Sequence, residues 1–213
     1  PKWELDYLRA AKERGPPIVL VLTGGSAIAF PREIADAILM VWYPGEEGGN
    51  AVADVIFGDV IPEGRLPVTF PKSTEDLPDF ADYSMKNRTY RYIEKEPLFP
   101  FGFGLSYTTF AFENMDVSQN GDSIKVCVNV KNTGDVDASN AVQLYIAKKN
   151  RTENDPICSL KAFEKIFVKA NGTEKVTFEL STKDFESINE EGESVLVSGE
   201  YNIIVADSSP SDL

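Results

Sequence analysis

The spacing of apolar residues changes once along the chain, at about residue 110. Residues 18–23 and 37–42 are short, almost wholly apolar runs, which is typical of strands buried on both faces of a parallel sheet. From about residue 111 onward, apolar and polar residues alternate with a period of two, as they do in half-buried strands. The sequence therefore predicts an α/β region that is followed by an all-β region.

In the first region, predicted strands alternate with predicted helices. The expected elements, in order, are an amphipathic helix at 3–14, a strand at 18–23, a short helix at 31–36, a strand at 37–42, a helix at about 49–57 and a short strand at 67–70. Gly15-Pro16-Pro17 ends the first helix and Gly58 ends the last one. This order predicts part of an α/β sandwich with a largely parallel sheet.

Ten aromatic residues crowd the segment that joins the two regions. They are Phe80, Tyr83, Tyr90, Tyr92, Phe99, Phe101, Phe103, Tyr107, Phe110 and Phe112. No helical or strand period persists across them, and so many rings bury too much apolar surface to remain disordered. We expect the rings to fasten a connector to the domains on both sides. Direct ligand binding by the rings is the less favoured alternative.

Five runs of alternating apolar residues predict strands in the second region. They are Ile124, Val126, Val128 and Val130; Val142, Leu144 and Ile146; Val176, Phe178 and Leu180; Val195 and Val197; and Tyr201, Ile203 and Val205. Turn clusters such as Asn120-Gly121-Asp122 separate them. The spacing predicts a β-sandwich of the immunoglobulin or fibronectin-III kind. The fold class is thus a partial α/β sandwich with a parallel sheet, followed by an all-β sandwich.

Composition excludes several classes of site and partner. The chain has no histidine and only two cysteines, which excludes a Ser-His-Asp nucleophile and any zinc site that needs imidazole or four thiolates. A net charge of −13 disfavours nucleic acid and anionic membranes, because both would repel it. No apolar run approaches the roughly 18 residues of a membrane helix. We therefore expect no metal, no cofactor, no nucleic acid and no membrane.

Two modifications are left open by the sequence. Cys127 and Cys158 are more readily explained as two packed thiols than as a disulfide, because an isolated pair in an acidic chain is usually reduced. The triplets that begin at Asn87, Asn150 and Asn171 fit the glycosylation pattern, which would matter only in a eukaryotic secretory protein. Because the sequence begins at Pro1 without a methionine or signal peptide, we expect a processed or excised segment.

Three stretches carry a resemblance to a known family. They are Trp42-Tyr43-Pro44-Gly45-Glu46-Glu47-Gly48-Gly49, Pro62-Glu63-Gly64-Arg65-Leu66-Pro67-Val68-Thr69-Phe70, and Asn87-Arg88-Thr89-Tyr90-Arg91-Tyr92 followed by Pro100-Phe101-Gly102-Phe103-Gly104. In this order and spacing they closely resemble the C-terminal half of glycoside hydrolase family 3, the β-glucosidases and β-xylosidases. The resemblance continues through Gly199-Glu200-Tyr201 and covers essentially the whole chain.

The resemblance implies a division of the chain and a place for the catalytic residues. Family members have a (β/α)8-type barrel, an α/β sandwich and often a fibronectin-III-like domain. By resemblance, residues 1–79 are the end of the α/β sandwich, 80–110 are the connector and 111–213 are the fibronectin-III-like domain. The family's retaining mechanism uses two carboxylates. Its nucleophilic aspartate belongs to the barrel and its acid–base glutamate to a segment upstream of 18–23, so we expect no catalytic residue in this chain.

Three residues are candidates for the substrate cleft. Glu46 and Glu47 lie in a glycine-rich loop after a predicted strand, where α/β folds place ligands. The favoured alternative is that one or both carboxylates cap the following helix. Ser26 follows Gly24-Gly25 in a second loop of this kind, where it has no base that would make it a nucleophile.

Two arginines are further, weaker candidates. Arg88 and Arg91 flank Tyr90 and could reach a sugar or an acidic group. An arginine among aromatic rings is at least as often structural, so this second interpretation stays open.

The resemblance also implies a function. It predicts hydrolysis of terminal, non-reducing β-linked sugars, glucose or xylose, by an enzyme of which this chain is the C-terminal part. We expect the chain to be inactive alone, to act with an N-terminal catalytic barrel chain or segment on an oligo- or disaccharide, and to be extracellular or periplasmic. The alternative is a non-catalytic carbohydrate-binding or adhesion β-sandwich module. The strands at 18–23 and 37–42 argue against it, because such a module would not carry so much uncovered sheet.

Overall fold

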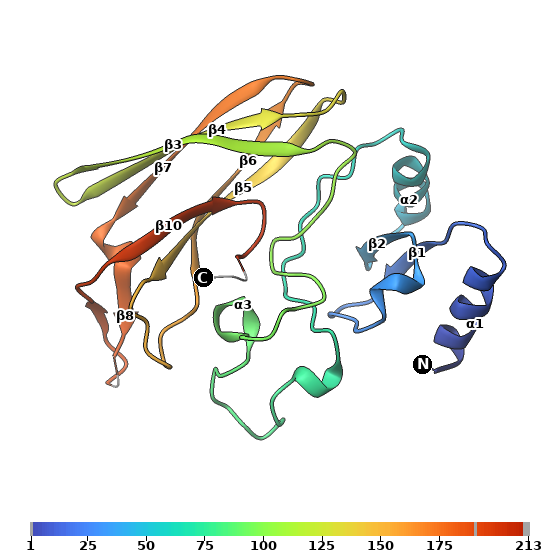
Figure 1. The fold of residues 1–213 in the computed structure, drawn as a ribbon, viewed down its shortest axis with the longest axis horizontal. Coiled ribbons are helices and arrows are strands. Elements are labelled where there is room, and N and C mark those ends of the chain that lie inside the picture. The colour runs from blue at the N-terminus through green and yellow to red at the C-terminus, as the bar shows by residue number, and fades with distance from the viewer. Residues whose placement is uncertain (1, 190, 211–213) are drawn as a thin grey trace.

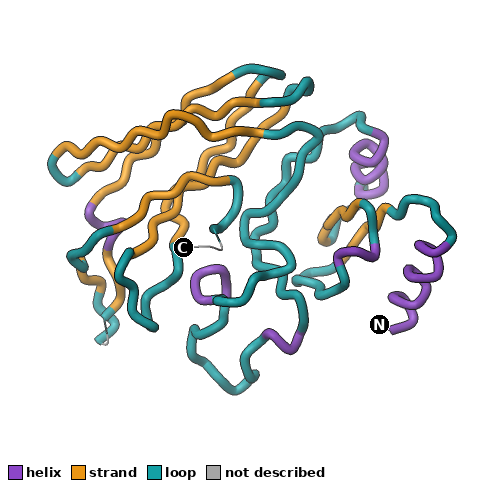
Figure 2. The backbone as a smooth tube through the Cα atoms, viewed as in Figure 1, coloured by secondary structure: helices purple, strands orange, loops and turns teal. Residues whose placement is uncertain are grey.

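The computed structural model describes residues 2–189 and 191–210, which form two lobes. An α/β lobe holds the N-terminal end, and a β-sandwich lies on the other side of the molecule (Figure 1). Figure 2 shows that loops, drawn in teal, fill most of the space between the two lobes. Positions 1, 190 and 211–213, which fall within the predicted domains, lie outside the described residues. No helix in the described ranges is long and apolar enough to cross a membrane.

The α/β lobe is built on two parallel strands. They are β1 (Val19–Thr23) and β2 (Ala37–Trp42), and a register shift after Leu22 places Thr23 opposite Trp42. The helices are α1 (Lys2–Glu13), the 3₁₀ helix η1 (Arg32–Ile34) and α2 (Gly48–Phe57). The strands predicted at 18–23 and 37–42 and the two long helices are therefore confirmed, whereas the short helix expected at 31–36 is a single 3₁₀ turn. Gly58, at φ 85°, ends α2 as predicted.

The third strand predicted at 67–70 does not form. Phe70 makes one isolated antiparallel bridge to Phe99, and its N–H donates to the Phe99 carbonyl over 2.9 Å. Pro67 and Pro71 on either side have no N–H, so neither can extend the bridge into a ladder. The sheet of the described α/β lobe accordingly has two strands.

One face of β1 is covered and the other is open. Leu20 and Leu22 pack into a cluster that also includes α1 residues and the buried core of this lobe, which is Phe30, Ile34, Phe70 and Phe99. Val19 and Val21 alternate with them and are 48% and 37% exposed. The prediction that β1 is buried on both faces is therefore wrong for this chain, because its described segments leave the second face in contact with solvent.

The second lobe is a sandwich of two antiparallel sheets. One contains β3 (Phe110–Asn120), β4 (Ser123–Asn132) and β7 (Thr173–Ser181), in the order β3-β4-β7. The other contains β10 (Tyr201–Ala206), β5 (Ala138–Lys148) and β6 (Ser159–Val168), in the order β10-β5-β6. The 3₁₀ helix η3 (Thr182–Phe185) leads to a small hairpin of β8 (Glu186–Ile188) and β9 (Ser194–Leu196).

The predicted alternation of the sandwich strands is confirmed in its core. The residues buried between the sheets are Val126, Val128, Val130, Val142, Leu144, Ile146, Val176, Phe178 and Leu180. Each belongs to β4, β5 or β7, three strands that the period-two pattern predicted. Alternation places these side chains on one face of each strand, so the two sheets share a continuous apolar layer.

Aromatic rings of the connector pack against both lobes. Phe99 and Phe103 stack in the α/β core with their ring centroids 5.3 Å apart. Tyr90, on the short helix α3 (Thr89–Tyr92), stacks on Phe101 with a centroid distance of 4.5 Å, and both rings pack against the buried cluster that contains Tyr145 of β5. The predicted fastening of the connector is therefore confirmed for these four rings. The proposed boundary at residue 110 remains a proposal, since Tyr90 and Phe101 already belong to a cluster of the sandwich.

A buried polar network also joins the connector to β5. Gln143 is 4% exposed, and its Nε2 donates to the carbonyl of Gly102 at 3.2 Å and to that of Asp207 at 2.8 Å. The Tyr145 hydroxyl donates to Gln143 Oε1 over 2.5 Å. Gly102 has a φ of +79°, and a Cβ there would lie 2.1 Å from Gln143 Oε1. The fixed amide of Gln143 thus leaves room only for glycine at position 102.

The two cysteines are both free, which confirms the interpretation as two packed thiols. Cys127 is partly buried, whereas Cys158 has no exposed surface. Burial raises the pKa of the Cys158 thiol to about 12, against a smaller opposing effect of Arg91. The thiolate is the reactive form of cysteine, so Cys158 has neither the access nor the charge that a reaction needs.

We expect one thiol to react in the folded chain and two after unfolding. Dithionitrobenzoate at about pH 8 should label Cys127 and leave Cys158 unmodified until denaturant is added. Absorbance of the released thiolate, with and without denaturant, measures both numbers, and Cys127→Ser identifies which thiol reacts first. Rapid labelling of two thiols in the native chain would contradict the buried position of Cys158.

Candidate functional site

Two loops meet at the carboxyl edge of the parallel sheet. One follows β1 and contains Gly24, Gly25 and Ser26; the other follows β2 and contains Tyr43 and residues 44–47. The Gly24 N–H donates to the Trp42 carbonyl at 3.2 Å, which ties the loops together. A Cβ on Gly25 would lie 2.9 Å from the Tyr43 ring, so the glycine permits this contact. Ligands of α/β folds bind at this edge.

The residue that ends β2 has an unusual backbone conformation. Trp42 has a φ of +54°, a left-handed value that costs a residue with a side chain about 1 kcal/mol. Its ring packs edge-to-face on Phe70 with centroids 6.2 Å apart, which keeps the side chain in the core while the backbone turns outward. Such strain concentrates at functional sites. No sequence pattern predicts this conformation, because φ at Trp42 depends on the tertiary contacts that hold the ring.

The sequence-predicted cleft residues lie on these loops and are exposed. Ser26, Glu46 and Glu47 all lie at the surface. Glu47 occupies the N-cap position of α2, but its carboxylate accepts a hydrogen bond from the Asn50 side-chain amide at 2.5 Å and does not cap the helix backbone. The expected capping role of Glu47 is therefore confirmed in its position at the helix end, but its side chain makes no capping hydrogen bond. The part these three residues play in a cleft remains a prediction.

A wide apolar groove runs along β2. It has a volume of about 930 Å³, and residues 37–40 of β2 line one wall. Arg65, Leu66 and residues 103–107 also line the groove. Trp42 borders the groove, whereas Ser26, Glu46 and Glu47 do not. The structure thus brings the three predicted residues to one edge of the sheet and places the large cavity beside them.

Arg65 brings a positive charge to this groove, and sequence reasoning did not single it out. Its Nη2 donates to Asn140 Oδ1 of β5 at 2.6 Å. Burial lowers the pKa of Arg65, and the charges of Asp207 and Glu63 oppose that effect. Glu63 accepts the Ser139 N–H at 2.7 Å and pairs with Lys165 at 2.7 Å. These contacts hold the groove wall against the sandwich.

The two candidate arginines of the connector have different surroundings. Arg88 donates to the carbonyls of Ser84 at 3.1 Å and Asp79 at 3.2 Å, and also to that of Asp82. Arg91 lies over the Tyr92 ring, with its Cζ 5.5 Å from the ring centroid. The structural interpretation therefore holds for Arg88, whose guanidinium is occupied by its own loop.

The site presents polar groups and the Tyr43 ring at the surface. It offers a hydroxyl, aromatic rings and exposed carboxylates, whereas an acid–base carboxylate is usually set by burial or a close charged partner. Among the described residues, no cluster of three or more cysteine, aspartate or glutamate side chains is placed to hold a metal ion.

Comparison with known protein families finds two matches, one in each half of the chain. Residues 1–107 match the glycosyl hydrolase family 3 C-terminal domain, and residues 140–209 match the fibronectin type III-like domain. The first match alone spans half of the chain. The chain therefore belongs to glycosyl hydrolase family 3.

Individual relatives are much longer than this chain. It is 43% identical to a xylan 1,4-beta-xylosidase of Xylanibacter ruminicola, over 98% of this chain and 25% of that protein. It is 34% identical to a periplasmic beta-glucosidase of Salmonella typhimurium, over 96% of this chain and 29% of that protein. The crystal structure of a Kluyveromyces marxianus beta-glucosidase in complex with glucose superposes with a TM-score of 0.89 at 37% identity, over 98% of this chain and 27% of that chain. The chain thus spans about a quarter of the length of these relatives.

Proposed function

We propose that this chain is the C-terminal portion of a retaining, exo-acting β-glycosidase that releases terminal β-linked glucose or xylose. The family match over residues 1–107 carries the proposal. The names of the relatives support both sugars, since they include a β-xylosidase and β-glucosidases. The periplasmic relative supports an extracellular or periplasmic location. A free-standing binding module is disfavoured, because it would have no use for the open apolar face of β1.

The catalytic aspartate and glutamate of the proposed enzyme lie outside this chain. A retaining glycosidase needs two carboxylates about 5 Å apart, one as nucleophile and one as acid and base. Glu46 and Glu47 are exposed on one loop, and nothing around them withdraws either carboxylate from solvent. We assign them, with Ser26, to the rim of the substrate cleft and not to bond cleavage. No step of this mechanism calls for a metal or an organic cofactor.

The open parts of the α/β lobe fit a partner from the same enzyme. Val19 and Val21 present an exposed apolar face, and a groove of about 930 Å³ follows β2. We propose that the N-terminal barrel chain or segment covers these surfaces, with an interface of more than roughly 2,000 Å². The loops after β1 and β2 then face its active-site cleft, where an oligo- or disaccharide binds.

Activity assays of separate and combined parts test the proposed function. The 213-residue chain alone should not hydrolyse p-nitrophenyl β-glucoside or β-xyloside above background, because it lacks both catalytic carboxylates. Addition of the barrel-bearing part of the same enzyme should restore turnover. Glu47→Gln should leave the turnover of the combined enzyme within about threefold of the unmodified one, since loss of a catalytic carboxylate would lower it by several powers of ten.

Two outcomes would contradict this assignment. Turnover by the chain alone that disappears in Glu47→Gln would place the acid–base residue in this chain. If the two parts associate tightly but their complex hydrolyses neither glycoside, the proposed reaction is refuted.

A further inference from the structure

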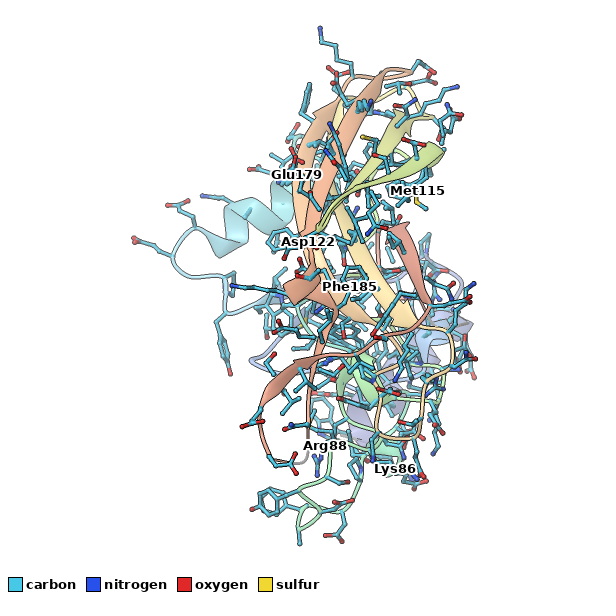
Figure 3. The ribbon with its side chains drawn as sticks, turned by 90° about the vertical axis from the view of Figure 1, so that its left-hand side faces the viewer. Lys86, Arg88, Met115, Asp122, Glu179 and Phe185 are labelled. Atoms are coloured by element: carbon cyan, nitrogen blue, oxygen red, sulfur yellow. The ribbon has the colours of Figure 1, made fainter. Side chains whose placement is uncertain are left out.

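A loop that follows the α/β lobe projects from the lower edge of the molecule (Figure 1). It comprises residues 77–88, between the 3₁₀ helix η2 (Thr74–Asp76) and α3, and is called the aromatic loop below. Phe80 is 94% and Tyr83 is 90% exposed. Figure 3, which labels Lys86 and Arg88, places this loop at the same end of the molecule from a second direction. Large apolar groups exposed together mark a contact surface.

The aromatic loop is held in shape by its own hydrogen bonds. Asp79 Oδ1 accepts the Ala81 N–H at 2.8 Å, and Asp82 Oδ1 accepts the Ser84 N–H at 2.8 Å. The guanidinium of Arg88 binds three carbonyls of the loop, those of Asp79, Asp82 and Ser84. Each turn is therefore held by a local side-chain hydrogen bond, and the loop that carries the two rings is already ordered. Such preorganisation lowers the entropy lost on binding.

The same contacts leave the aromatic loop without free charge. Its charged residues are Asp79, Asp82, Lys86 and Arg88, which sum to zero. The two aspartates and Arg88 bind backbone groups, and Lys86 pairs with Glu153. The chain as a whole carries a charge of −13, which repels anionic surfaces. The chemistry of the loop therefore fits a neutral partner that offers flat apolar faces.

We propose that Phe80 and Tyr83 form a stacking platform for the neutral sugar units of a β-linked glycan. A pyranose ring has an apolar face of C–H bonds that packs on an aromatic ring, and the Tyr83 hydroxyl is free to bond with the sugar's hydroxyl groups. The inference rests on the proposed function, which gives the reason why the neutral partner is a glycan. It assigns the aromatic loop to holding substrate and leaves bond cleavage to the carboxylates outside this chain.

Native gel electrophoresis with and without soluble polysaccharide tests the platform. The 213-residue chain should migrate more slowly in gels that contain soluble xylan or mixed-linkage β-glucan than in gels without them. The double variant Phe80→Ala/Tyr83→Ala should bind about tenfold more weakly, since each stacked ring contributes a modest share of the affinity. The affinity of Arg88→Ala for the polysaccharide should lie between that of the unmodified chain and that of the double variant. This change keeps both rings but removes the hydrogen bonds that hold the loop in shape.

Phe57→Ala is the matched control variant. Phe57 is 82% exposed on α2, so its removal also takes away an exposed ring but leaves the aromatic loop unchanged, and retardation should persist. Thermal melting of each variant shows whether it is folded.

Each other outcome would overturn the inference. One such outcome is that neither polysaccharide retards the chain, and another is that all the variants are retarded equally. A loop that instead holds two copies of the chain together would show as a dimer in size-exclusion chromatography that Phe80→Ala separates, without a response to sugar. Retardation in the gel needs no hydrolysis. If the chain binds glycan but the combined enzyme is inactive, the result refutes the proposed function and leaves this inference standing.

Discussion

Gly102→Ala is expected to lower the free energy of unfolding by about 3 kcal/mol or more. The left-handed φ of +79° accounts for about 1 kcal/mol of this. The new Cβ would lie 2.1 Å from Gln143 Oε1, so the amide must move. Gln143 is fixed by hydrogen bonds to Gly102, Asp207 and Tyr145, and each buried polar group left without a partner costs about 1–3 kcal/mol.

Gly121→Ala separates the steric clash from the backbone strain. Gly121 also has a positive φ, +59°, but nothing lies within 4 Å of its Cβ position. The free energy of unfolding of Gly121→Ala should therefore fall by only about 1 kcal/mol. Urea unfolding followed by far-UV circular dichroism measures both variants. Equal losses for the two glycines would show that Gln143 yields easily and that the network between connector and β5 is not rigid.

Tyr90→Ala is the second change with a large expected effect, a loss of about 3 kcal/mol of stability. The Tyr90 ring stacks on Phe101 at 4.5 Å and meets Tyr145 edge-to-face at 6.0 Å. Its hydroxyl accepts the Leu160 N–H at 3.0 Å. Alanine would leave a cavity between connector and sandwich and would also leave that N–H without its partner.

Two matched variants define what Tyr90 contributes. Tyr90→Phe keeps the ring and removes the hydroxyl, so we expect a loss of about 1 kcal/mol. Tyr83→Ala removes a ring that is 90% exposed on the same connector, and its stability should change by less than about 0.5 kcal/mol. Similar unfolding midpoints for Tyr90→Ala and Tyr83→Ala would contradict the packing described for the connector.

The sequence predicted best the elements that have a regular apolar pattern. The strands β1 and β2 are short apolar runs, and β4 and β7 alternate toward the core, whereas β5 is buried on both faces over residues 142–147. The strand expected at 67–70 failed because Pro67 and Pro71 cannot donate to a ladder. A short apolar run therefore predicts a strand only where backbone hydrogen bonding is also available.

Two long sandwich strands escaped prediction because their exposed faces hide the pattern. In β6, Phe163 and Phe167 point outward and are 70% and 55% exposed, which fills polar positions with apolar residues. The second half of β3 is exposed along both faces, so no alternation is left to detect. Both strands lie at the edge of their sheets, where packing constrains sequence least.

The candidate site was predictable only as a set of loops. Resemblance and the position after a strand placed Ser26, Glu46 and Glu47 in the loops that follow β1 and β2, and their part in a cleft stays a prediction. The strained backbone of Trp42, the contact of Gly25 with Tyr43 and the groove beside Arg65 depend on contacts between distant segments, which no local pattern encodes.

The packing of the connector constrains where the genes of two relatives can be recombined. Tyr90 and Phe101 precede the first sandwich strand but lie in the same cluster as Tyr145. A gene fusion that joins two relatives at residue 111 would pair the rings of one parent with the pocket of the other. Recombination should therefore be tolerated best upstream of Tyr90, so that the sandwich is inherited together with the aromatic segment that seals it.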